Sequence, residues 1–355
     1  MGTAERAATG ANGRKPRMRF WAGILFSAGF SAILAMLVLE GAVRLLWPQR
    51  PYEDWVAPDA RYGHLYKANQ HSQYPFPGSD FVMDLRINSL GFRDDEPDPP
   101  VAGGKTVLFV GDSYTMGFAL DLESRFDRRL ARLFKENGRE FRFINTGVDG
   151  WGTVQETRYA EDHFDTLRPD IVVLTFCEND AYDDATFLAR GGPTPVETRP
   201  VRLFLQTHSH LYRFAYGLQW MWQHRNEVKE LGRSQKPDGV TDPADAITIP
   251  EDLWRQSLQR LREFHASLLK YNPNAVLIVQ ATSPTSADVR AHLSSLDNGT
   301  SLCYVDLGGP VSALPVKERR LPHDPHWSAR VHELSARALY ERIAKLPPTL
   351  GNAQK

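Results

Sequence analysis

From Lys105 onward, short apolar runs alternate with segments whose apolar residues recur at helical spacing. The apolar runs are TVLFVGD (106–112), FRFINTG (141–147), DIVVLTFCEND (170–180), NAVLIVQAT (274–282) and SLCYVDLGG (301–309). The helical patterns cover 122–138, 153–167, 250–271, 286–296 and 326–346. Runs that are apolar on both faces and alternate with helices are typical of a parallel sheet that helices cover on both sides. The sequence therefore predicts an α/β fold with about five parallel strands.

A second feature precedes this pattern. The stretch FWAGILFSAGFSAILAMLVL, from Phe20 to Leu39, contains no charged residue. As a helix it would be about 30 Å long, which is the hydrocarbon thickness of a bilayer. Basic residues dominate the segment before it, so the positive-inside rule places residues 1–19 in the cytoplasm and the rest of the chain outside. A cleaved signal peptide is the alternative, but the length of the run and the lack of a clear A-x-A site favour an uncleaved anchor over 20–47.

Composition excludes fewer classes of function than these two patterns do. The 355 residues are 42% hydrophobic with a formal net charge of −1, which is ordinary for a globular protein and does not indicate nucleic-acid binding. Cys177 and Cys303 both lie in apolar runs, so we expect buried thiols rather than a disulfide. Residues 48–104 are rich in Pro, Tyr and Asp with little periodicity, which indicates an extracytoplasmic linker and lead-in. The last segment, 347–355, is expected to be a tail.

Polar clusters follow the predicted strands. Ligands of parallel α/β sheets bind where the carboxyl ends of the strands meet. The residues at these positions are Asp112-Ser113, Asn145 with Gly147, Gly150 and Gly152, and Glu178-Asn179-Asp180. The closing helix is preceded by HDPH, residues 323–326. We therefore expect all four clusters on one rim of the sheet.

These residues supply the parts that nucleophilic catalysis needs. Ser113, at a strand-to-helix turn, is the candidate nucleophile, and His326 is the candidate base that accepts its proton. Asp324 can orient the imidazole and stabilise its charged form. The side-chain amide of Asn179 and the backbone N–H groups of Gly150 and Ser113 can form an oxyanion hole.

The blocks FVGDSYTMG, NTGVDGWGT, CEND and DPHW occur in this order, and together they resemble the SGNH (GDSL-type) hydrolase superfamily. The resemblance covers 105–346 and implies a flavodoxin-like sheet. Members are esterases, lipases, thioesterases and enzymes acting on carbohydrate acetyl groups. It also implies the roles given above for Ser113, Gly150, Asn179 and His326. NSLGFRDDE, before the first block, is similar to the lead-in of membrane-anchored bacterial members.

The chain departs from the family pattern at two positions. Cys177 stands where the third block, G-x-N-D, has glycine, and His323 stands where the fourth block, D-x-x-H, has aspartate. The acid closest to the histidine is Asp324, in a D-x-H-W arrangement that resembles the alginate O-acetyltransferase-like branch, which acts on extracytoplasmic polysaccharides. An acyl transferase is therefore an alternative to a hydrolase.

Simpler interpretations exist for each site residue. Ser113 and Asp324 are suited to helix capping, His326 to a helix start at the surface, and Asn179 to a turn. Asp112 is expected to be structural, and Asp180 to be structural or to form a hydrogen bond with the loop that holds Ser113. Two histidines and one aspartate within four residues cannot easily aim at one ion, so no metal is expected, and no other cofactor is expected.

Residues 181–249 interrupt the strand–helix alternation and are predicted to be a helical insertion rich in aromatic residues. Its central part, 199–231, contains Phe204, Tyr212, Phe214, Tyr216, Trp220 and Trp222. We consider three interpretations: a cap on the sheet, a lid on the substrate pocket, or an amphipathic element at the bilayer.

The sequence as a whole predicts a membrane-anchored, extracytoplasmic serine esterase that forms an acyl-enzyme on Ser113. Its substrate would be an ester or an acylated carbohydrate. The alternatives are an O-acetyltransferase of a cell-envelope polysaccharide and a catalytically silent binding or scaffold protein of the same fold.

Overall fold

The computed structural model describes residues 15–48, 55–75, 81–100, 104–192, 200–223, 248–321 and 324–346. Residues 1–14 of the tail predicted at 1–19, the tail predicted at 347–355, and His323 lie outside these residues. The chain divides into two compact units, Met1–Glu53 with Thr198–Arg225, and Asp54–Glu197 with Asn226–Lys355. We describe each unit by itself.

The larger unit is built on a five-stranded sheet in the order β6-β5-β7-β8-β9, with every pairing parallel. The strands are β5 (Lys105–Gly111), β6 (Phe141–Asn145), β7 (Ile171–Phe176), β8 (Val276–Ala281) and β9 (Leu302–Tyr304). This is the flavodoxin-like strand order, in which the chain reverses its direction of progress between the first and third strands. The predicted fold class is confirmed, and the ends of β5 and β7 lie at this reversal.

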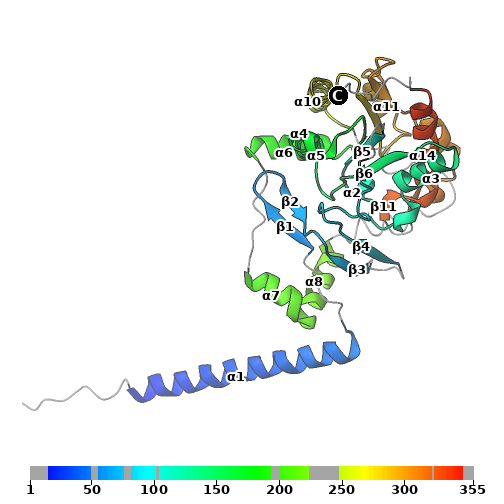
Figure 1. The fold of residues 1–355 in the computed structure, drawn as a ribbon. Helices are drawn as coiled ribbons and strands as arrows, with labels where there is room; N and C mark the ends of the chain where they lie inside the picture. Colours follow the sequence, from blue (N-terminus) through cyan, green and yellow to red (C-terminus); the bar gives the residue numbers. More distant parts are fainter. Residues whose placement is uncertain are drawn as a thin grey trace, which may run out of the picture. The chain divides into compact units, whose positions relative to one another are not determined.

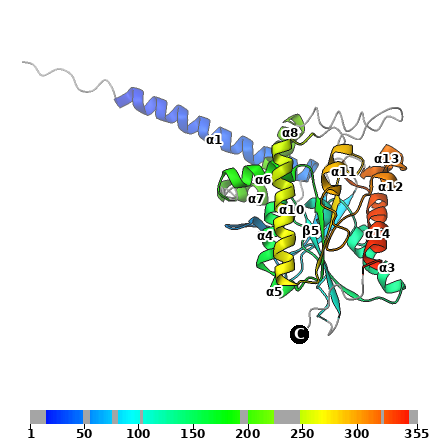
Figure 2. The same ribbon diagram turned by 90° about the horizontal axis from the view of Figure 1, so that it is seen from above.

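Helices cover both faces of the sheet (Figures 1 and 2). One face packs on α3 (Phe126–Glu136) and α14 (Ala329–Ala344), and the other on α4 (Thr153–Asp162) and α10 (Glu251–Tyr271). Side chains alternate along each strand, so Ile171 and Val173 of β7 enter one core and Val172 and Leu174 the other. Burial on both faces explains why each strand is a continuous apolar run.

The remaining helices of this unit are short. They are α2 (Ser113–Met116), η1 (Leu122–Ser124), α5 (Phe164–Leu167), α6 (Asp180–Ala189), α11 (Ala287–Ser294), α12 (Gly308–Ser312) and α13 (Val316–Arg319). A two-stranded antiparallel ribbon, β10 (Arg320–Leu321) with β11 (Asp324–Trp327), precedes α14. The predicted closing helix therefore starts later than 326, because residues 324–327 are extended.

The lead-in is more ordered than its composition indicated. β1 (Val56–Asp59) pairs with β2 (Gly63–Tyr66), and β3 (His71–Pro75) pairs with β4 (Val82–Arg86), each antiparallel. β1 and β3 are four and five residues long and between them contain Pro, His and Gln, so they lack the alternation that would have predicted them. They are held by packing, as where Tyr62 contacts the rings of Trp151 and Tyr159.

The smaller unit contains α1 (Lys15–Leu46), α7 (Pro200–His208) and α8 (His210–Gln223). Within α1, Phe20–Leu46 has a mean hydropathy of 2.3 and is long and apolar enough to cross a membrane. A helix of this kind near the N-terminus serves either as a membrane span or as a signal sequence. α8 packs against α1, and the rings of Trp47 and Phe214 stack at 6.4 Å. The segments 193–199 and 224–247 of the predicted insertion lie outside the described residues.

Candidate active site

Ser113 lies at the turn between β5 and α2. Asp112 caps α2, because its Oδ1 accepts a hydrogen bond from the Tyr114 N–H at 2.9 Å. α2 ends after one turn at Gly117, whose φ of +76° is left-handed and favours glycine. Asp112 is therefore structural, and it fixes the backbone that presents the half-buried Ser113.

The strand β11 places His326 against Ser113. The imidazole Nε2 lies 2.7 Å from Ser113 Oγ, and Nδ1 lies 2.5 Å from Asp324 Oδ1. The same carboxylate oxygen accepts the His326 backbone N–H at 2.9 Å. Trp327 anchors the strand, because its fully buried indole donates to the Thr282 carbonyl at 2.8 Å. The structure thus forms a continuous hydrogen-bonded chain from carboxylate to imidazole to hydroxyl.

Helix capping does not account for Asp324 or His326. The N-cap of α14 is Ser328, whose side chain accepts from the Val331 N–H. Asp324 is instead engaged by the ring and backbone of His326. A position two residues before the histidine suffices because β11 is extended, and side chains two residues apart in a strand lie on the same face.

Sequence reasoning missed the residues that hold the imidazole in place. The Tyr114 ring lies 4.6 Å and the Phe118 ring 5.2 Å from the His326 ring, between centroids. Arg320 donates to the Tyr114 hydroxyl and to the Pro325 carbonyl, both at 2.9 Å. Tyr114 could have been found from the sequence, because it is adjacent to Ser113. Nothing in the sequence around Arg320 distinguishes it from other arginines.

The two other predicted oxyanion groups occupy the loops that follow β6 and β7. Gly150 is exposed and has a φ of +72°, in a loop held by a hydrogen bond of 2.8 Å between the His64 Nε2 and the Asp149 carbonyl oxygen. The Asn179 amide donates to Asp183 Oδ2 at 2.8 Å. The amide nitrogen carries two N–H bonds, so the second one stays available for donation to a bound substrate while Asp183 orients the side chain.

Buried carboxyl groups surround the ends of β5 and β7. They are Asp112, Glu156, Glu178, Asp180 and Asp184. Burial raises the pKa of all five, to about 6 for Asp112 and about 7 for Asp184. Asp180 accepts from the Cys177 N–H and the Thr153 hydroxyl, each at 3.0 Å, so it joins the end of β7 to the start of α4 rather than to the turn of Ser113. Among the described residues, no group of three or more His, Cys, Asp or Glu is arranged to hold a metal ion.

Two buried arginines fasten the Ser113 turn to the lead-in. Arg93 donates to the carbonyls of Gly117 and Leu120 at 2.6 and 2.7 Å. Arg125, also fully buried, donates to the Arg93 carbonyl and to Asp127, each at 2.6 Å. Close packing adds to this: a Cβ on Gly147 would lie 2.3 Å from the Met116 nitrogen. Arg93 belongs to the NSLGFRDDE segment, so that segment supports the backbone behind Ser113.

The expected thiols are confirmed: Cys177 and Cys303 are both free and buried. At the glycine position of the third block, the Cys177 sulfur lies 3.2 Å from the Thr282 hydroxyl, within the core.

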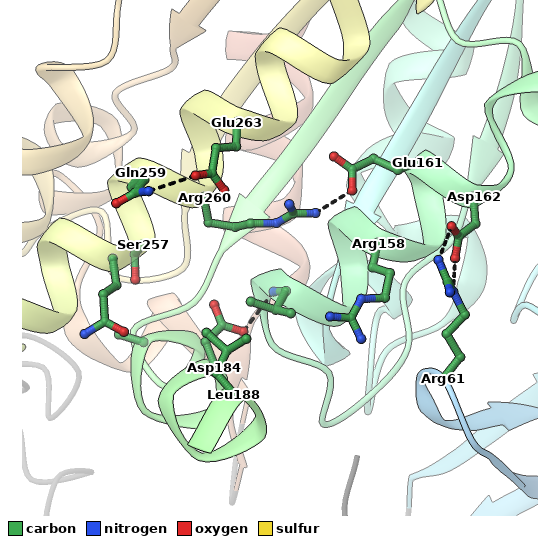
Figure 3. Close-up of a pocket in the computed structure, with 13 residues that line it drawn as sticks. Arg61, Arg158, Glu161, Asp162, Asp184, Leu188, Ser257, Gln259, Arg260 and Glu263 are labelled. Carbon is green, nitrogen blue, oxygen red and sulfur yellow. Dashed lines mark hydrogen bonds and ion pairs between the residues drawn. The ribbon is translucent and has the colours of Figure 1, made fainter. Parts of the chain in front are cut away.

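A separate cavity of about 410 Å³ lies among α4, α6 and α10 (Figure 3). Ion pairs line it, with Arg260 bound to Glu161 at 2.7 Å and Arg61 bound to Asp162. The guanidinium of Arg158 lies over the Phe187 ring, 5.1 Å from its centroid. None of Ser113, Asp324 and His326 lines this cavity, so it is not part of the hydrogen-bonded chain described above.

Comparison with known proteins matches residues 109–334 to the GDSL-like lipase/acylhydrolase family. The chain therefore belongs to the GDSL-like lipase/acylhydrolase family, and it is a serine hydrolase of the SGNH type. The match spans the strand and helix elements from β5 into α14, which is the part of the chain that carries the predicted blocks.

Solved structures with a similar fold include several named as lipases or esterases. The lipase Lip_vut3 from a goat rumen metagenome is 14% identical, with 70% of this chain and 99% of that chain covered and a TM-score of 0.43. A family 3 carbohydrate esterase of Clostridium thermocellum is 15% identical, with 67% and 94% covered and a TM-score of 0.38. The psychrotrophic esterase EstA of Pseudoalteromonas sp. is 12% identical, with 68% and 97% covered and a TM-score of 0.37. No curated protein matches the chain.

Proposed function

We propose that Ser113 is the nucleophile of an ester-cleaving enzyme, with His326 as its base and Asp324 as the group that orients the base. The observation that carries this proposal is the chain of two short contacts, 2.7 Å from Ser113 Oγ to Nε2 and 2.5 Å from Nδ1 to Asp324.

The geometry supports a two-step reaction. Ser113 Oγ bonds to the ester carbonyl carbon as its proton passes to His326 Nε2, and Asp324 stabilises the imidazolium. The imidazolium then gives that proton to the departing alkoxide, which leaves an acyl group on Ser113. Water attacks the acyl carbon, loses a proton to Nε2, and the acid is released as Ser113 recovers its hydrogen. The backbone N–H of Ser113 and Gly150 and the amide of Asn179 would stabilise the oxyanion.

The test compares Ser113→Ala with the wild-type chain on p-nitrophenyl acetate. We expect turnover to fall by about 10³-fold or more, because the nucleophile is lost. Ser294→Ala, at an exposed position in α11, is the matched control and should keep full activity. Unchanged turnover by a folded Ser113→Ala protein refutes the site.

We further propose that α1 remains as a membrane anchor, with the N-terminus in the cytoplasm and the hydrolase unit outside. The length and hydropathy of Phe20–Leu46 support this. An exported active site would meet envelope esters and acylated glycans, so these are the proposed substrate class.

Acyl transfer is the second candidate for the same site. The motif Asp324-Pro-His326-Trp327, in which the acid precedes the histidine by two residues, favours acyl transfer. Transfer requires that an acceptor hydroxyl, rather than water, attacks the acyl carbon on Ser113. Product analysis separates the two: free acid indicates hydrolysis, and an acylated sugar indicates transfer.

A further inference from the structure

Glu40 joins the membrane-length helix to the paired helices α7 and α8. Its carboxylate accepts hydrogen bonds from the Ser209 hydroxyl at 2.7 Å and from the backbone N–H groups of His210 and Leu211, both at 2.9 Å. A carboxylate at the N-terminus of α8 satisfies donors that have no partner within the helix. Arg44 completes the connection by donating to Glu40 and to the His208 carbonyl.

Glu40 lies where a span that starts at Phe20 would leave the hydrocarbon. Twenty residues of helix measure about 30 Å, the thickness of the bilayer core. The last turns of α1 and the docked helices would then lie at the level of the headgroups. This depth suits elements that have one apolar and one polar face.

Both α7 and α8 expose apolar side chains at helical spacing. In α7, Val201 and Phe204 are one turn apart and are 70% and 60% exposed. In α8, Leu218 and Trp222 are one turn apart and are 48% and 67% exposed. Apolar side chains that are exposed together indicate a surface that contacts lipid or another protein.

The charges of these helices match lipid phosphate. α7 and α8 contain Arg202 and Arg213 and no Asp or Glu. The Arg202 guanidinium lies 5.4 Å from the centroid of the Tyr216 ring, next to the apolar rows. Basic residues beside aromatic ones are the composition of helices that lie in anionic membrane surfaces.

We infer that α7 and α8 form a membrane-surface platform, docked to the anchor through Glu40, with Val201, Phe204, Leu218 and Trp222 inserted among lipid acyl chains at the interface. This inference rests on the proposed membrane anchor. It extends the contact with lipid from a single helix to a three-helix unit.

The test uses the full-length chain reconstituted in vesicles of phosphatidylethanolamine and phosphatidylglycerol. Nitroxide labels are attached to Phe204→Cys and Leu218→Cys, with Leu34→Cys as the lipid reference and Gln259→Cys, exposed on α10, as the water reference. The native thiols are buried, and the unsubstituted chain is the labelling blank. Collision rates with oxygen and with a water-soluble nickel chelate report depth.

We expect the ratio of oxygen to nickel accessibility at positions 204 and 218 to exceed that at 259 severalfold and to fall below that at 34. If the accessibility ratios at 204 and 218 equal that at 259 while the label at 34 reports lipid, the platform is refuted and the anchor is retained. Labels that neither reagent reaches indicate a protein partner and also overturn it. If the label at 34 reports water, the anchor fails and the platform with it.

A second variant tests the docking contact. Glu40→Gln keeps the size of the side chain but places an amide where backbone N–H groups need acceptors. We expect the label at 218 to become more mobile and its accessibility ratio to fall severalfold. No change in either quantity would show that Glu40 does not hold α8 at the membrane.

Discussion

Asp324 and His326 are separated by one proline, yet their contacts with Ser113 differ, and the proposed mechanism assigns them unequal roles. The imidazole contacts the hydroxyl of Ser113 directly, whereas the carboxylate acts only through the imidazole. Loss of the base removes the proton acceptor, while loss of the carboxylate charge leaves a base that is less well oriented and less well stabilised.

We therefore expect both variants to lower kcat/KM and His326→Ala to lower it more than Asp324→Asn. In serine proteases, the corresponding losses are about 10⁶-fold and about 10⁴-fold in kcat. Steady-state kinetics on p-nitrophenyl acetate measures the order. The reverse order would mean that the two roles are assigned wrongly.

Asp184 offers a test of the buried carboxyl groups. Burial raises its folded-state pKa from 3.8 to about 7, so between these values the folded chain binds a proton that the unfolded chain does not. Wild-type stability should therefore rise as the pH falls from about 7 towards 4, by at most about 1.4 kcal/mol per pH unit. Asp184→Asn can still accept the Val154 N–H, now 2.8 Å from the carboxylate, and lacks this titration.

The measurement is the free energy of unfolding of both chains between pH 8 and pH 5. Asp184→Asn should be more stable than the wild type at pH 8, and the difference should shrink as the pH falls. A difference that stays constant with pH would show that Asp184 is already neutral or solvated throughout this range.

The sequence predicted Ser113 and Asn179 because they follow apolar runs, where parallel topology brings the ends of distant strands together. Asp324 was predicted from its place just before the closing helix. Arg320 could not be found in this way, because its contacts with Tyr114 and Pro325 depend on the β10–β11 ribbon. The hydrogen bond from Asn179 to Asp183 could not be predicted either, because it depends on where α6 begins and on the side-chain conformation of Asn179.

The lead-in segment supports the backbone behind Ser113, which the sheet alone does not hold in place. Arg93 crosses from the lead-in to the carbonyls behind Ser113, and burial lowers its pKa to about 10, so it stays charged at neutral pH. A buried charge held only by hydrogen bonds to backbone makes a rigid connection, because each unsatisfied bond would be costly.

Arg93→Lys should lower the free energy of unfolding by about 2–5 kcal/mol, because an ammonium cannot span the carbonyls of Gly117 and Leu120 together. We also expect kcat to fall as the Ser113 turn loosens. Arg86→Lys is the control: Arg86 pairs with Asp84 at 3.0 Å but is half exposed, so the change should cost less than about 1 kcal/mol. Equal losses in the two variants would contradict the supporting role of Arg93.

The strand–helix alternation was predictable because periodicity and burial agree in every core strand. The hairpins were not, since β1 and β3 are short, contain polar residues and depend on aromatic packing from elsewhere in the chain. The sequence of the insertion shows that it is rich in aromatic residues, but it does not show which element these residues pack against. The structure pairs α8 with α1, a contact between residues more than 160 positions apart.

The proposed anchor predicts how the protein behaves when cells are fractionated. The protein should stay in the membrane fraction after an alkaline carbonate wash, because an apolar helix that spans the bilayer is not released by removing charge contacts. Detergent should release it with its N-terminal segment intact, as read by mass spectrometry. Release by carbonate, or a mature N-terminus beyond Leu39, would show a signal sequence instead.

The proposed mechanism requires that Ser113 is an activated hydroxyl at the strand end. A fluorophosphonate probe tests it most directly, because phosphonylation requires a serine whose proton is removed by a neighbouring base. We predict one adduct, mapped by peptide mass spectrometry to Ser113, much slower in His326→Ala and absent in Ser113→Ala. A folded wild-type chain that remains unlabelled, or that is labelled only at another residue, would show that Ser113 is not the activated nucleophile.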